Sequence, residues 1–479
     1  MSDEIELKLD MGEGALNAVR SLPLLAEAKA ETNRQLSIYF DTPGAKLGKQ
    51  GCTLRLRLAK GGWVQTVKLA SAAGGLVERR EWEWEAAGEQ PEPERLAGLP
   101  IEVGSLDRLA RKLVPVLRSE VERTSWQVEV DDSRVQVDLD AGTLSAGERR
   151  TGIEELEFEL LDGPATVLGP LARQVVEQLP ARLGVLSKSD RGTALMDGNL
   201  GRPAKAAPLE VTSDLTVAQA FAAIVHACLK HFRLNEDVVI ACRDPVALHQ
   251  ARVAMRRLRS AFTLFKPAIA ADPKAAFLRE ELRWFTNQLG EARDLDVYLT
   301  RDLPAEERAR AFARREITYS QVIEAMNDAR SRMLMVELTG WAFTGSWRDG
   351  SRAVGLITPF AAKRMDRLWG SVEPTGRSLT RMEEEARHQL RIQVKKLRYA
   401  VEFFDRLYPS KDKKRFREAA EQVQEALGRL NDLRTARAMN RNQEDSWLQE
   451  QSEELAHLQH AELAVQKMAK AGPFWRTQA

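Results

Sequence analysis

The sequence has few cysteines, few aromatic residues and no long apolar run, and these shortages exclude several classes of protein. Its three cysteines, Cys52, Cys228 and Cys242, are irregularly spaced among 479 residues, which argues against a disulfide framework and a zinc site. No apolar stretch approaches the roughly 18 residues that a membrane span needs. The acidic N-terminus leads directly into a predicted strand, so we expect no signal peptide and a cytoplasmic location.

The formal net charge of +1 conceals a difference between the two halves of the chain. Residues 1–210 carry 27 basic and 34 acidic side chains, whereas residues 211–479 carry 44 and 36. A chain of this length exceeds the roughly 150 residues of a typical domain. We therefore predict two or three units, and the opposite charges indicate that the halves have different roles.

Short strands in which charged and apolar residues alternate dominate the first 200 residues. Because successive strand side chains point to opposite faces, Glu4, Glu6 and Lys8 share one face while Ile5 and Leu7 share the other. Many regularly spaced strands predict an antiparallel sheet closed into a barrel. The predicted strands are 3–9, 36–41, 52–58, 63–70, 76–85, 123–130, 134–139 and 153–161, with helices at 13–29, 105–117 and 164–180.

The second half changes to long amphipathic helices. A linker rich in Pro, Gly and Ala at 201–212 separates a strand domain, 1–200, from a helical domain, 213–472. The helical domain contains two similar copies, at about 213–300 and 376–470, which predict two bundles of about four helices each. The fold class is therefore multidomain α+β, and residues 472–479 are expected to form a loose tail.

A basic stripe recurs in both copies of the helical repeat. At 100° per residue, four positions at offsets 0, 3, 7 and 10 fall within an arc of about 80° on one helix. These positions are His249, Arg252, Arg256 and Arg259 in the first copy and His388, Arg391, Lys395 and Arg398 in the second. A single basic stripe is usually a solvated face, but two matching stripes would line a shared cationic groove.

The order of the charges in the strand domain favours a charge-lined lumen over a solvated outer face, although alternation alone fits both. Glu155, Glu157 and Glu159 would repel one another on a bare surface. Beside Glu4 and Glu6 they offer oxygen ligands for Mg²⁺ or Mn²⁺. The cations that would hold phosphate oxygens across the lumen are Arg55, Arg57, Lys68, Arg79, Arg123, Lys188 and Arg191. This combination predicts a metal-dependent phosphoanhydride site.

An ordered set of motifs in residues 3–197 resembles the CYTH domain of the triphosphate tunnel metalloenzymes. The motifs are Glu4-x-Glu6-x-Lys8, Tyr39-Phe-Asp-Thr-Pro43, Leu54-Arg-Leu-Arg57, Thr66-Val-Lys68, Arg79-x-Glu81, Arg123, Asp138/Asp140, Glu155-x-Glu157-x-Glu159 and Leu186-Ser-Lys188-x-x-Arg191. The resemblance implies an antiparallel eight-stranded β tunnel with flanking helices that hydrolyses or rearranges triphosphates.

The same resemblance assigns expected roles to individual residues. It implies Glu4, Glu6, Glu157 and Glu159 as metal ligands, with Glu155 and Asp140 nearby. Lys8 joins the cations named above as a substrate contact, although it would serve equally well to neutralise Glu4 and Glu6. The expected catalytic set is Glu4, Glu6, Lys8 and Arg57.

Residues 211–470 resemble the CHAD domain, the conserved-histidine α-helical domain that commonly follows CYTH. The matching motifs are the two stripes and two shorter segments. These segments are Leu289-Gly290 with Asp294-Leu295, and Leu427-Gly428 with Asp432-Leu433. The resemblance implies that the basic groove binds inorganic polyphosphate, and association with polyphosphate granules would follow. We do not expect nucleic acid, because aromatic residues for base stacking are not interleaved with the stripes.

The sequence as a whole predicts a metal-dependent hydrolase of inorganic triphosphate with a polyphosphate-binding module, similar to bacterial CYTH–CHAD inorganic triphosphatases. Two alternatives stay open. The same tunnel would serve a thiamine triphosphatase or a class IV-type adenylyl cyclase, or the protein would bind polyphosphate without catalysis. No membrane partner is expected, and no pattern in the sequence indicates an oligomeric state.

Overall fold

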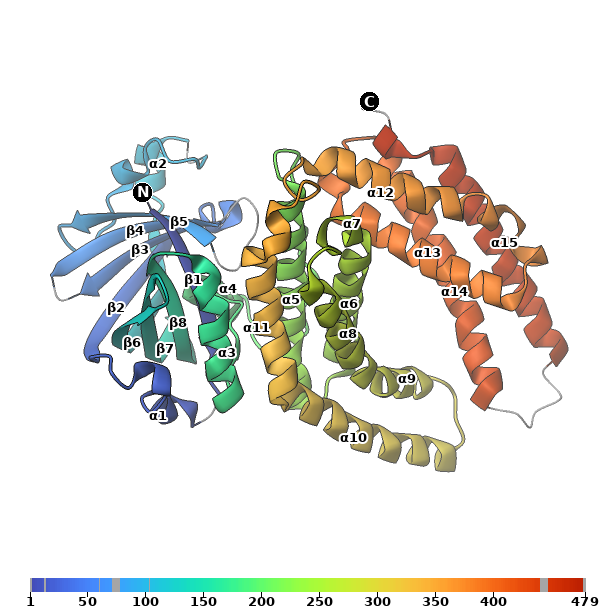
Figure 1. The fold of residues 1–479 in the computed structure, drawn as a ribbon, viewed down its shortest axis with the longest axis horizontal. Coiled ribbons are helices and arrows are strands. Elements are labelled where there is room, and N and C mark those ends of the chain that lie inside the picture. Colours follow the sequence, from blue (N-terminus) through green and yellow to red (C-terminus); the bar gives the residue numbers. More distant parts are fainter. Residues whose placement is uncertain are drawn as a thin grey trace. The chain divides into compact units, whose positions relative to one another are not determined.

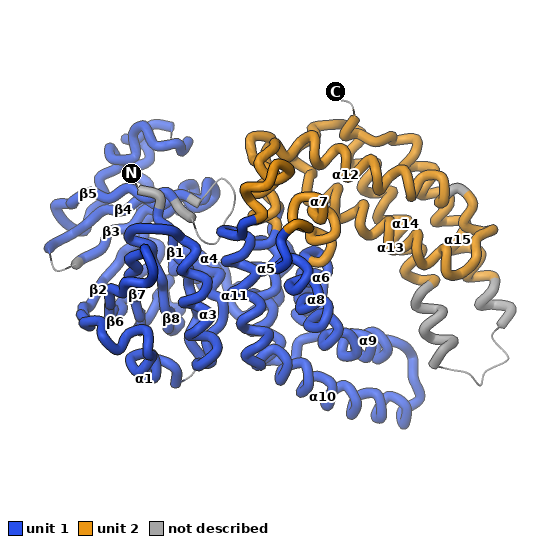
Figure 2. Tube along the Cα trace, in the orientation of Figure 1, with its two compact units in different colours: residues 1–208, 225–258, 272–346 blue, residues 209–224, 259–271, 347–479 orange. Residues whose placement is uncertain are grey.

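The computed structural model describes most of the chain (Figure 1). It describes residues 2–12, 14–59, 61–70, 78–102, 104–439 and 447–476, without the side chains at 2, 3, 59, 70, 78, 79, 377, 431–439 and 447–451. None of the helices among these residues is long and apolar enough to cross a membrane. The chain divides into two compact units, of residues 1–208, 225–258 and 272–346 and of residues 209–224, 259–271 and 347–479 (Figure 2).

Eight antiparallel strands form a closed ring in the first unit, because β1 pairs with β8 on one side and with β5 on the other. A two-residue strand, β9 (Arg182–Leu183), pairs with the end of β1. The predicted eight-stranded tunnel is therefore confirmed, with one short additional strand. The order around the ring is β5 (Glu78–Ala86), β4 (Gly62–Ala70), β3 (Cys52–Ala59), β2 (Glu31–Asp41), β6 (Val114–Val130), β7 (Ser133–Ala146), β8 (Arg149–Asp162) and β1 (Ser2–Asp10).

Alternation along the strands places apolar side chains outside the ring. Leu7 and Leu9 of β1 and Leu156 and Phe158 of β8 are buried, and helix α3 (Leu168–Gln178) packs against both strands. The outer face of β3, β4 and β5 carries a second apolar cluster, which includes Leu96 of a 3₁₀ turn (Pro93–Leu96) and Leu109 of α2 (Leu106–Ala110). Burial of the outer face leaves the charged face directed into the ring.

Two of the predicted helices in the strand domain are wrong over much of their length. The predicted helix 105–117 ends early at α2, because Val114 and Pro115 already pair with Asp41 and Phe40 of β2. Pairing with a strand more than 70 residues away overrides the local helical pattern. The predicted helix 13–29 is reduced to α1 (Ala15–Val19) and a 3₁₀ turn (Pro23–Leu25).

Helices complete the first unit. They are α4 (Lys188–Met196), parts of α5 (Val217–Cys242) and α6 (Pro245–Leu264), α8 (Pro273–Gln288), α9 (Gly290–Tyr298), α10 (Ala305–Asn327) and α11 (Ala329–Thr344). Helix α11 packs on α3, and a Cβ built on Gly340 would lie 3.3 Å from the Cα of Gly169. The predicted linker is also attached here, because Ala204 exchanges two backbone hydrogen bonds with the side chain of Asn235, at 3.0 and 2.9 Å.

The second unit is helical and contains α7 (Lys266–Ile269), α12 (Ile357–Val372), α13 (Glu384–Phe403), α14 (Asp412–Met439) and α15 (Trp447–Ala471). The expectation of a loose tail is wrong for residues 474–476. Phe474 and Trp475 are buried and pack edge-on against Phe416, and the Trp475 indole donates to Asp366 at 2.8 Å. Aromatic burial outweighs the ordering cost that usually leaves a terminus loose.

Candidate active site

A polar cavity of about 230 Å³ lies inside the strand ring. Seven carboxylates and six cations are among its lining residues, so the charged strand faces point inward, as the order of the charges predicted. The lining carboxylates are Glu4, Glu6, Glu81, Glu83, Asp140, Glu157 and Glu159, and the lining cations are Lys8, Arg55, Arg57, Lys68, Arg123 and Lys188.

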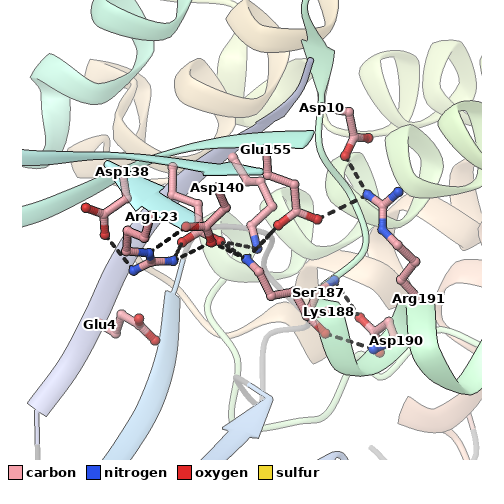
Figure 3. A network of polar contacts seen from close by, with 12 residues as sticks. Glu4, Asp10, Arg123, Asp138, Asp140, Glu155, Ser187, Lys188, Asp190 and Arg191 are labelled. Atoms are coloured by element: carbon pink, nitrogen blue, oxygen red, sulfur yellow. Dashed lines mark hydrogen bonds and ion pairs between the residues drawn. The ribbon is translucent and has the colours of Figure 1, made fainter. Parts of the chain in front are cut away.

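One group of carboxylates in the ring is neutralised by ammonium groups (Figure 3). Oxygens of Asp140, Glu155 and Glu157 lie within 4.8 Å of one another, and Lys188 Nζ contacts all three at 2.7, 2.8 and 3.0 Å. Lys8 Nζ lies 2.7 Å from Glu157. Burial opposes the charge on Glu157, but these ammonium groups outweigh it and hold the pKa of Glu157 well below its ordinary value.

Arg123 of β6 binds the same group from a neighbouring strand (Figure 3). Its guanidinium donates two hydrogen bonds of 2.6 Å to Asp140, one of 2.6 Å to Asp138 and one of 2.7 Å to Glu157. Arg123 and Asp140 face each other in the β6–β7 register. Since a guanidinium fork matches carboxylate and phosphate oxygens alike, Arg123 would also grip a bound phosphate chain.

A second group of carboxylates has less cationic compensation. Lys68 Nζ binds both oxygens of Glu4 at 2.7 and 2.6 Å and lies 3.3 Å from Glu81. Within the described part of the chain, no hydrogen bond or ion pair engages the side-chain carboxylate of Glu159. Burial raises the pKa of Glu159 to about 7, and the negative charges of Glu4 and Glu6 add to this effect while Lys68 opposes it. These carboxylates therefore retain capacity for a further cation.

Two arginines of β3, Arg55 and Arg57, form ion pairs of 3.2 to 3.9 Å with carboxylates of β5. Arg55 lies 3.8 Å from Glu81 and 3.9 Å from Glu83, and Arg57 lies 3.2 Å from Glu83. The buried Nε atoms of Arg55 and Arg57 have no hydrogen-bond partner among the described residues. Burial and the nearby charge of Arg55 lower the pKa of Arg57. A bound anion would supply both guanidinium groups with the acceptors they lack.

Lys188 reaches the ring from a helix, not from a strand. It is the first residue of α4, whose start is fixed by a capping box (Figure 3). In this box the Ser187 hydroxyl accepts from the Asp190 amide at 3.0 Å, and the Asp190 carboxylate accepts from the Ser187 amide at 3.3 Å. The cap sets the direction of the first helical turn, so the Lys188 side chain points to the carboxylates.

The first basic stripe gathers several cations in the first unit. His249, Arg252 and Arg256 of α6 are half-buried and lie near Arg293 of α9. Burial lowers the pKa of His249 to about 4, and the neighbouring charges of Arg293, Arg256 and Arg252 contribute. Arg252 also donates to the Leu289 carbonyl at 2.5 Å. Because the cations repel one another, this cluster favours an added anion.

The second stripe lies on α13 in the second unit, where its four side chains are half-buried. Arg398 donates to Gln424 at 2.5 Å and its guanidinium lies 4.6 Å from the Tyr399 ring centroid. Arg259, the last position of the first stripe, also belongs to the second unit, and Arg391 has a buried Nε atom without a hydrogen-bond partner among the described residues. The motif around Asp432 lies outside the described side chains.

Comparison with protein families matches both halves of the chain, in the order that the sequence motifs predicted. The CYTH domain model matches residues 2–192, and the CHAD domain model matches residues 223–441. The chain carries a CYTH domain followed by a CHAD domain. The family resemblance noted in the sequence is therefore confirmed.

Individual relatives match separate parts of this CYTH–CHAD chain. An inorganic triphosphatase of Haemophilus influenzae is 29% identical over 201 residues, which are 41% of this chain and 55% of the relative, so the chain spans about half the length of that relative. The crystal structure of the CHAD domain from Ricinus communis is 29% identical, covers 58% of this chain and 97% of its own, and has a TM-score of 0.45. The protein HpAC1 from Hippeastrum is 21% identical over 41% of this chain and 97% of its own, with a TM-score of 0.31.

Arg191 and Glu155 are predicted site residues of the CYTH domain that are not among the described residues lining the cavity, and the side chain of a third, Arg79, is not described. Arg191 of α4 lies 2.7 Å from Asp10 and 3.2 Å from Glu155 (Figure 3). Glu155 is fully buried behind the cavity surface. The backbone of Arg79 pairs with Glu4 in the β5–β1 register, but its side chain lies outside the described part. The substrate-binding roles of Arg79 and Arg191 and the metal-binding role of Glu155 stay predictions.

Two lining carboxylates of the CYTH domain were not among the predicted site residues. Glu81 and Glu83 of β5 lie on the cavity wall, with Glu81 near Lys68 and Glu83 near Arg57. Their alternation with Trp82 and Trp84, which pack on the outer face, contained the signal. The charged face of the β5 strand therefore predicts both residues from the sequence.

Proposed function

We propose that the CYTH domain hydrolyses inorganic triphosphate with the help of Mg²⁺ or Mn²⁺, and that the CHAD domain binds inorganic polyphosphate through its two basic stripes. The observation that carries the first proposal is the cavity inside the strand ring, in which carboxylates of one wall face the guanidinium and ammonium groups of another. The inorganic triphosphatase of Haemophilus influenzae, similar over 41% of this chain, supports the same activity.

The charge balance of the cavity supports a requirement for metal ions. Among the described lining residues, seven carboxylates against six cations leave no net positive charge for a substrate that itself carries several negative charges. Divalent cations would supply the missing charge, and an all-carboxylate donor set suits Mg²⁺ or Mn²⁺. Glu4, Glu6 and Glu159 would hold such an ion, because all three line the cavity on the adjacent strands β1 and β8, with Glu157 nearby. A bound metal neutralises charge on phosphoryl oxygens and lowers the pKa of water.

The cations of the chain would position the phosphate groups. Arg55, Arg57 and Arg123 present guanidinium forks to the cavity, and Lys8 and Lys188 present ammonium groups. Phosphoryl transfer depends mainly on positioning and on stabilisation of charge on the transferred group, so these side chains would provide much of the catalysis. Lys8 and Lys188 contact carboxylates in the structure, and on substrate binding they would exchange those partners for phosphate oxygens.

The size and lining of the cavity favour inorganic triphosphate over thiamine triphosphate or ATP. A volume of about 230 Å³ accommodates a short phosphate chain, and among the described lining residues Tyr39 is the only aromatic side chain. Organic groups usually require a larger and more apolar recess than this. A wholly non-enzymatic tunnel is less favoured, because the cavity brings Glu4, Glu157 and Glu159 together as oxygen donors for a metal ion beside the cations that would hold phosphate.

Phosphate release from tripolyphosphate, ATP and thiamine triphosphate tests this proposal. With Mg²⁺ or Mn²⁺ present, we expect tripolyphosphate to be hydrolysed fastest, and chelation of the metal should reduce the rate to background because the cavity then repels the substrate. Faster turnover of thiamine triphosphate, or formation of cyclic AMP from ATP, would assign a different substrate to the tunnel. Absence of turnover with all three compounds would leave only the binding role.

The raised pKa of Glu159 predicts a proton release linked to metal binding. Between its ordinary pKa of 4.5 and its value of about 7 in the folded protein, Glu159 retains a proton that a metal ion must displace. We therefore expect Mn²⁺ binding at pH 6 to release a proton. The affinity for Mn²⁺ should decrease as the pH falls from 7 towards 4.5. Calorimetry in two buffers of different ionisation enthalpy measures this release.

The variant Glu159→Gln provides the control for this proton release. Without metal, Glu159 should make the wild type more stable as the pH falls from 7 towards 4.5, because the folded state binds the proton more tightly than the unfolded state. The variant should lose this stabilisation and the linked proton release. An unchanged release in the variant would assign the proton to another group.

A further inference from the structure

The end of the catalytic strand β1 is held by residues outside the ring. Asp10, the last residue of β1, accepts from Arg191 at 2.7 Å, and the same Arg191 nitrogen lies 3.2 Å from Glu155 (Figure 3). Glu155 in turn binds Lys188 at 2.8 Å and lies 3.6 Å from Lys8. A side chain that fixes Asp10 therefore influences ion pairs that reach the cavity lining.

Arg233 of α5 supplies this fixation from the CHAD domain. It is 2% exposed, its Nε donates to the Leu183 carbonyl of β9 at 2.9 Å, and its guanidinium lies 3.5 Å from Asp10. Glu236 and Asp237 bind the same guanidinium and hold it in place. A buried guanidinium with bonds to all its nitrogens has little freedom, so it is a rigid anchor.

The contact of Arg233 with β9 also connects Arg233 to the site through backbone hydrogen bonds. Leu183 pairs with Leu9 of β1, and the next amide, of Gly184, donates to the Lys8 carbonyl at 2.8 Å. A Cβ on Gly184 would lie 2.7 Å from Lys8 Cγ, so this close approach requires glycine. The main chain at Lys8 and Leu9 is thus held by the segment that Arg233 binds.

We propose that Arg233 is a positioning residue for the tunnel: it acts through Asp10 and Arg191 on Glu155, and through Leu183 and Gly184 on Lys8. This inference rests on the proposed triphosphatase function and adds that the CHAD domain supplies a residue on which the geometry of the CYTH site depends. Because small displacements of catalytic groups reduce rates strongly, the tunnel requires the helical domain for full activity.

Arg332 of α11 is a matched control for Arg233. It is also an arginine of the CHAD domain that binds the CYTH domain, through hydrogen bonds to the carbonyls of Val176, Leu179 and Ala181. These carbonyls belong to the end of α3 and to the segment that leads into β9, and within the described part of the chain no hydrogen bond of Arg332 reaches Asp10 or Leu183. Loss of Arg332 therefore weakens the attachment of the domains and loosens the residue before β9, but it removes no contact of Asp10 or of the Leu183 carbonyl.

The test compares Arg233→Met, Arg233→Lys and Arg332→Met in the full chain. We expect Arg233→Met to lower kcat/KM for tripolyphosphate about tenfold, whereas Arg332→Met changes it less than about twofold. Arg233→Lys should recover part of the rate, because an ammonium still attracts Asp10 but lacks the fork that also reaches Leu183. In a double-variant cycle, Asp10→Asn should lower kcat/KM little further when Arg233→Met is already present. In the Arg332→Met background, the same substitution should lower kcat/KM as much as it does in the wild type.

The outcomes separate this inference from the proposed function. Thermal unfolding of each variant shows whether a loss of activity is accompanied by a loss of stability. Equal losses of activity in Arg233→Met and Arg332→Met, or additive effects of Asp10→Asn and Arg233→Met, would overturn the positioning role while leaving the triphosphatase intact. Failure of the wild type to hydrolyse tripolyphosphate would instead refute the proposed function. Tripolyphosphate affinity, measured by calorimetry, would then decide the inference: weakening in Arg233→Met alone supports it, and equal affinity in both variants overturns it.

Discussion

Glu4→Gln is expected to lower the rate of phosphate release from tripolyphosphate by about 100-fold or more while the protein stays folded. Glu4 lies on the cavity wall and shares Lys68 with Glu81. Burial would raise the pKa of Glu4, but Lys68 outweighs it and keeps the pKa below the ordinary value. The side chain is therefore an ionised ligand for a cation, and the isosteric amide removes its charge without removing its volume. Initial rates at saturating Mn²⁺ measure the effect.

Glu154→Gln is the matched control for this loss. Glu154 lies on β8 beside Glu155, but its side chain is exposed and is not among the cavity-lining residues. The control should hydrolyse tripolyphosphate at the wild-type rate, and both variants should retain polyphosphate as the wild type does. Equal rates for Glu4→Gln and wild type would contradict the assignment of Glu4 to the metal site.

The combined substitution of Arg256 and Lys395 by alanine is expected to raise the Kd for inorganic polyphosphate about 100-fold, because two charge-assisted hydrogen bonds are lost. Each residue lies third in its basic stripe and is half-buried, and the Arg256 Nε has no hydrogen-bond partner among the described residues. Binding to long-chain polyphosphate at two salt concentrations measures the loss, which should be accompanied by a weaker salt dependence.

Removal of two exposed cations elsewhere controls for the change in net charge. Arg310 and Lys414 have side chains that are 77% and 85% exposed, so their joint replacement by alanine alters the charge equally and should leave polyphosphate binding near wild type. Tripolyphosphate hydrolysis should be normal in both double variants. If Arg256→Ala with Lys395→Ala abolished hydrolysis as well, the division of labour between the two domains would be wrong.

Much of the strand ring was predictable because each strand carries its own pattern. Alternation of Leu54 and Leu56 with Arg55 and Arg57 identifies a strand with one apolar and one charged face, whatever its partner. The pattern gives no information about where a long strand begins. Val114 reads as the end of a helix, and only its pairing with Asp41 makes it the start of β6. Long-range pairing of this kind cannot be detected in a local window.

The candidate site was predictable as a set of residues but not as a set of contacts. The motifs identified Lys188 and Arg191 together, three positions apart. Both side chains contact Glu155 in the structure, but Lys188 also contacts Asp140 and Glu157 whereas Arg191 binds Asp10. Residues three positions apart are neighbours on one face of a helix, so the spacing of the motif alone cannot tell which acidic partner each one has. Arg233 carries no motif at all, and its importance follows only from its burial against β9.

The sequence alone determined the two-domain order, the closed sheet with its charges inside and the twin basic stripes, because periodicity and motif spacing are local properties of a chain. Only the tertiary structure decided which carboxylate shares which cation, that Glu159 has the least cationic compensation, and that a CHAD arginine reaches the end of β1. These depend on distances between residues far apart in the chain, and electrostatic interactions in a buried site change steeply with such distances.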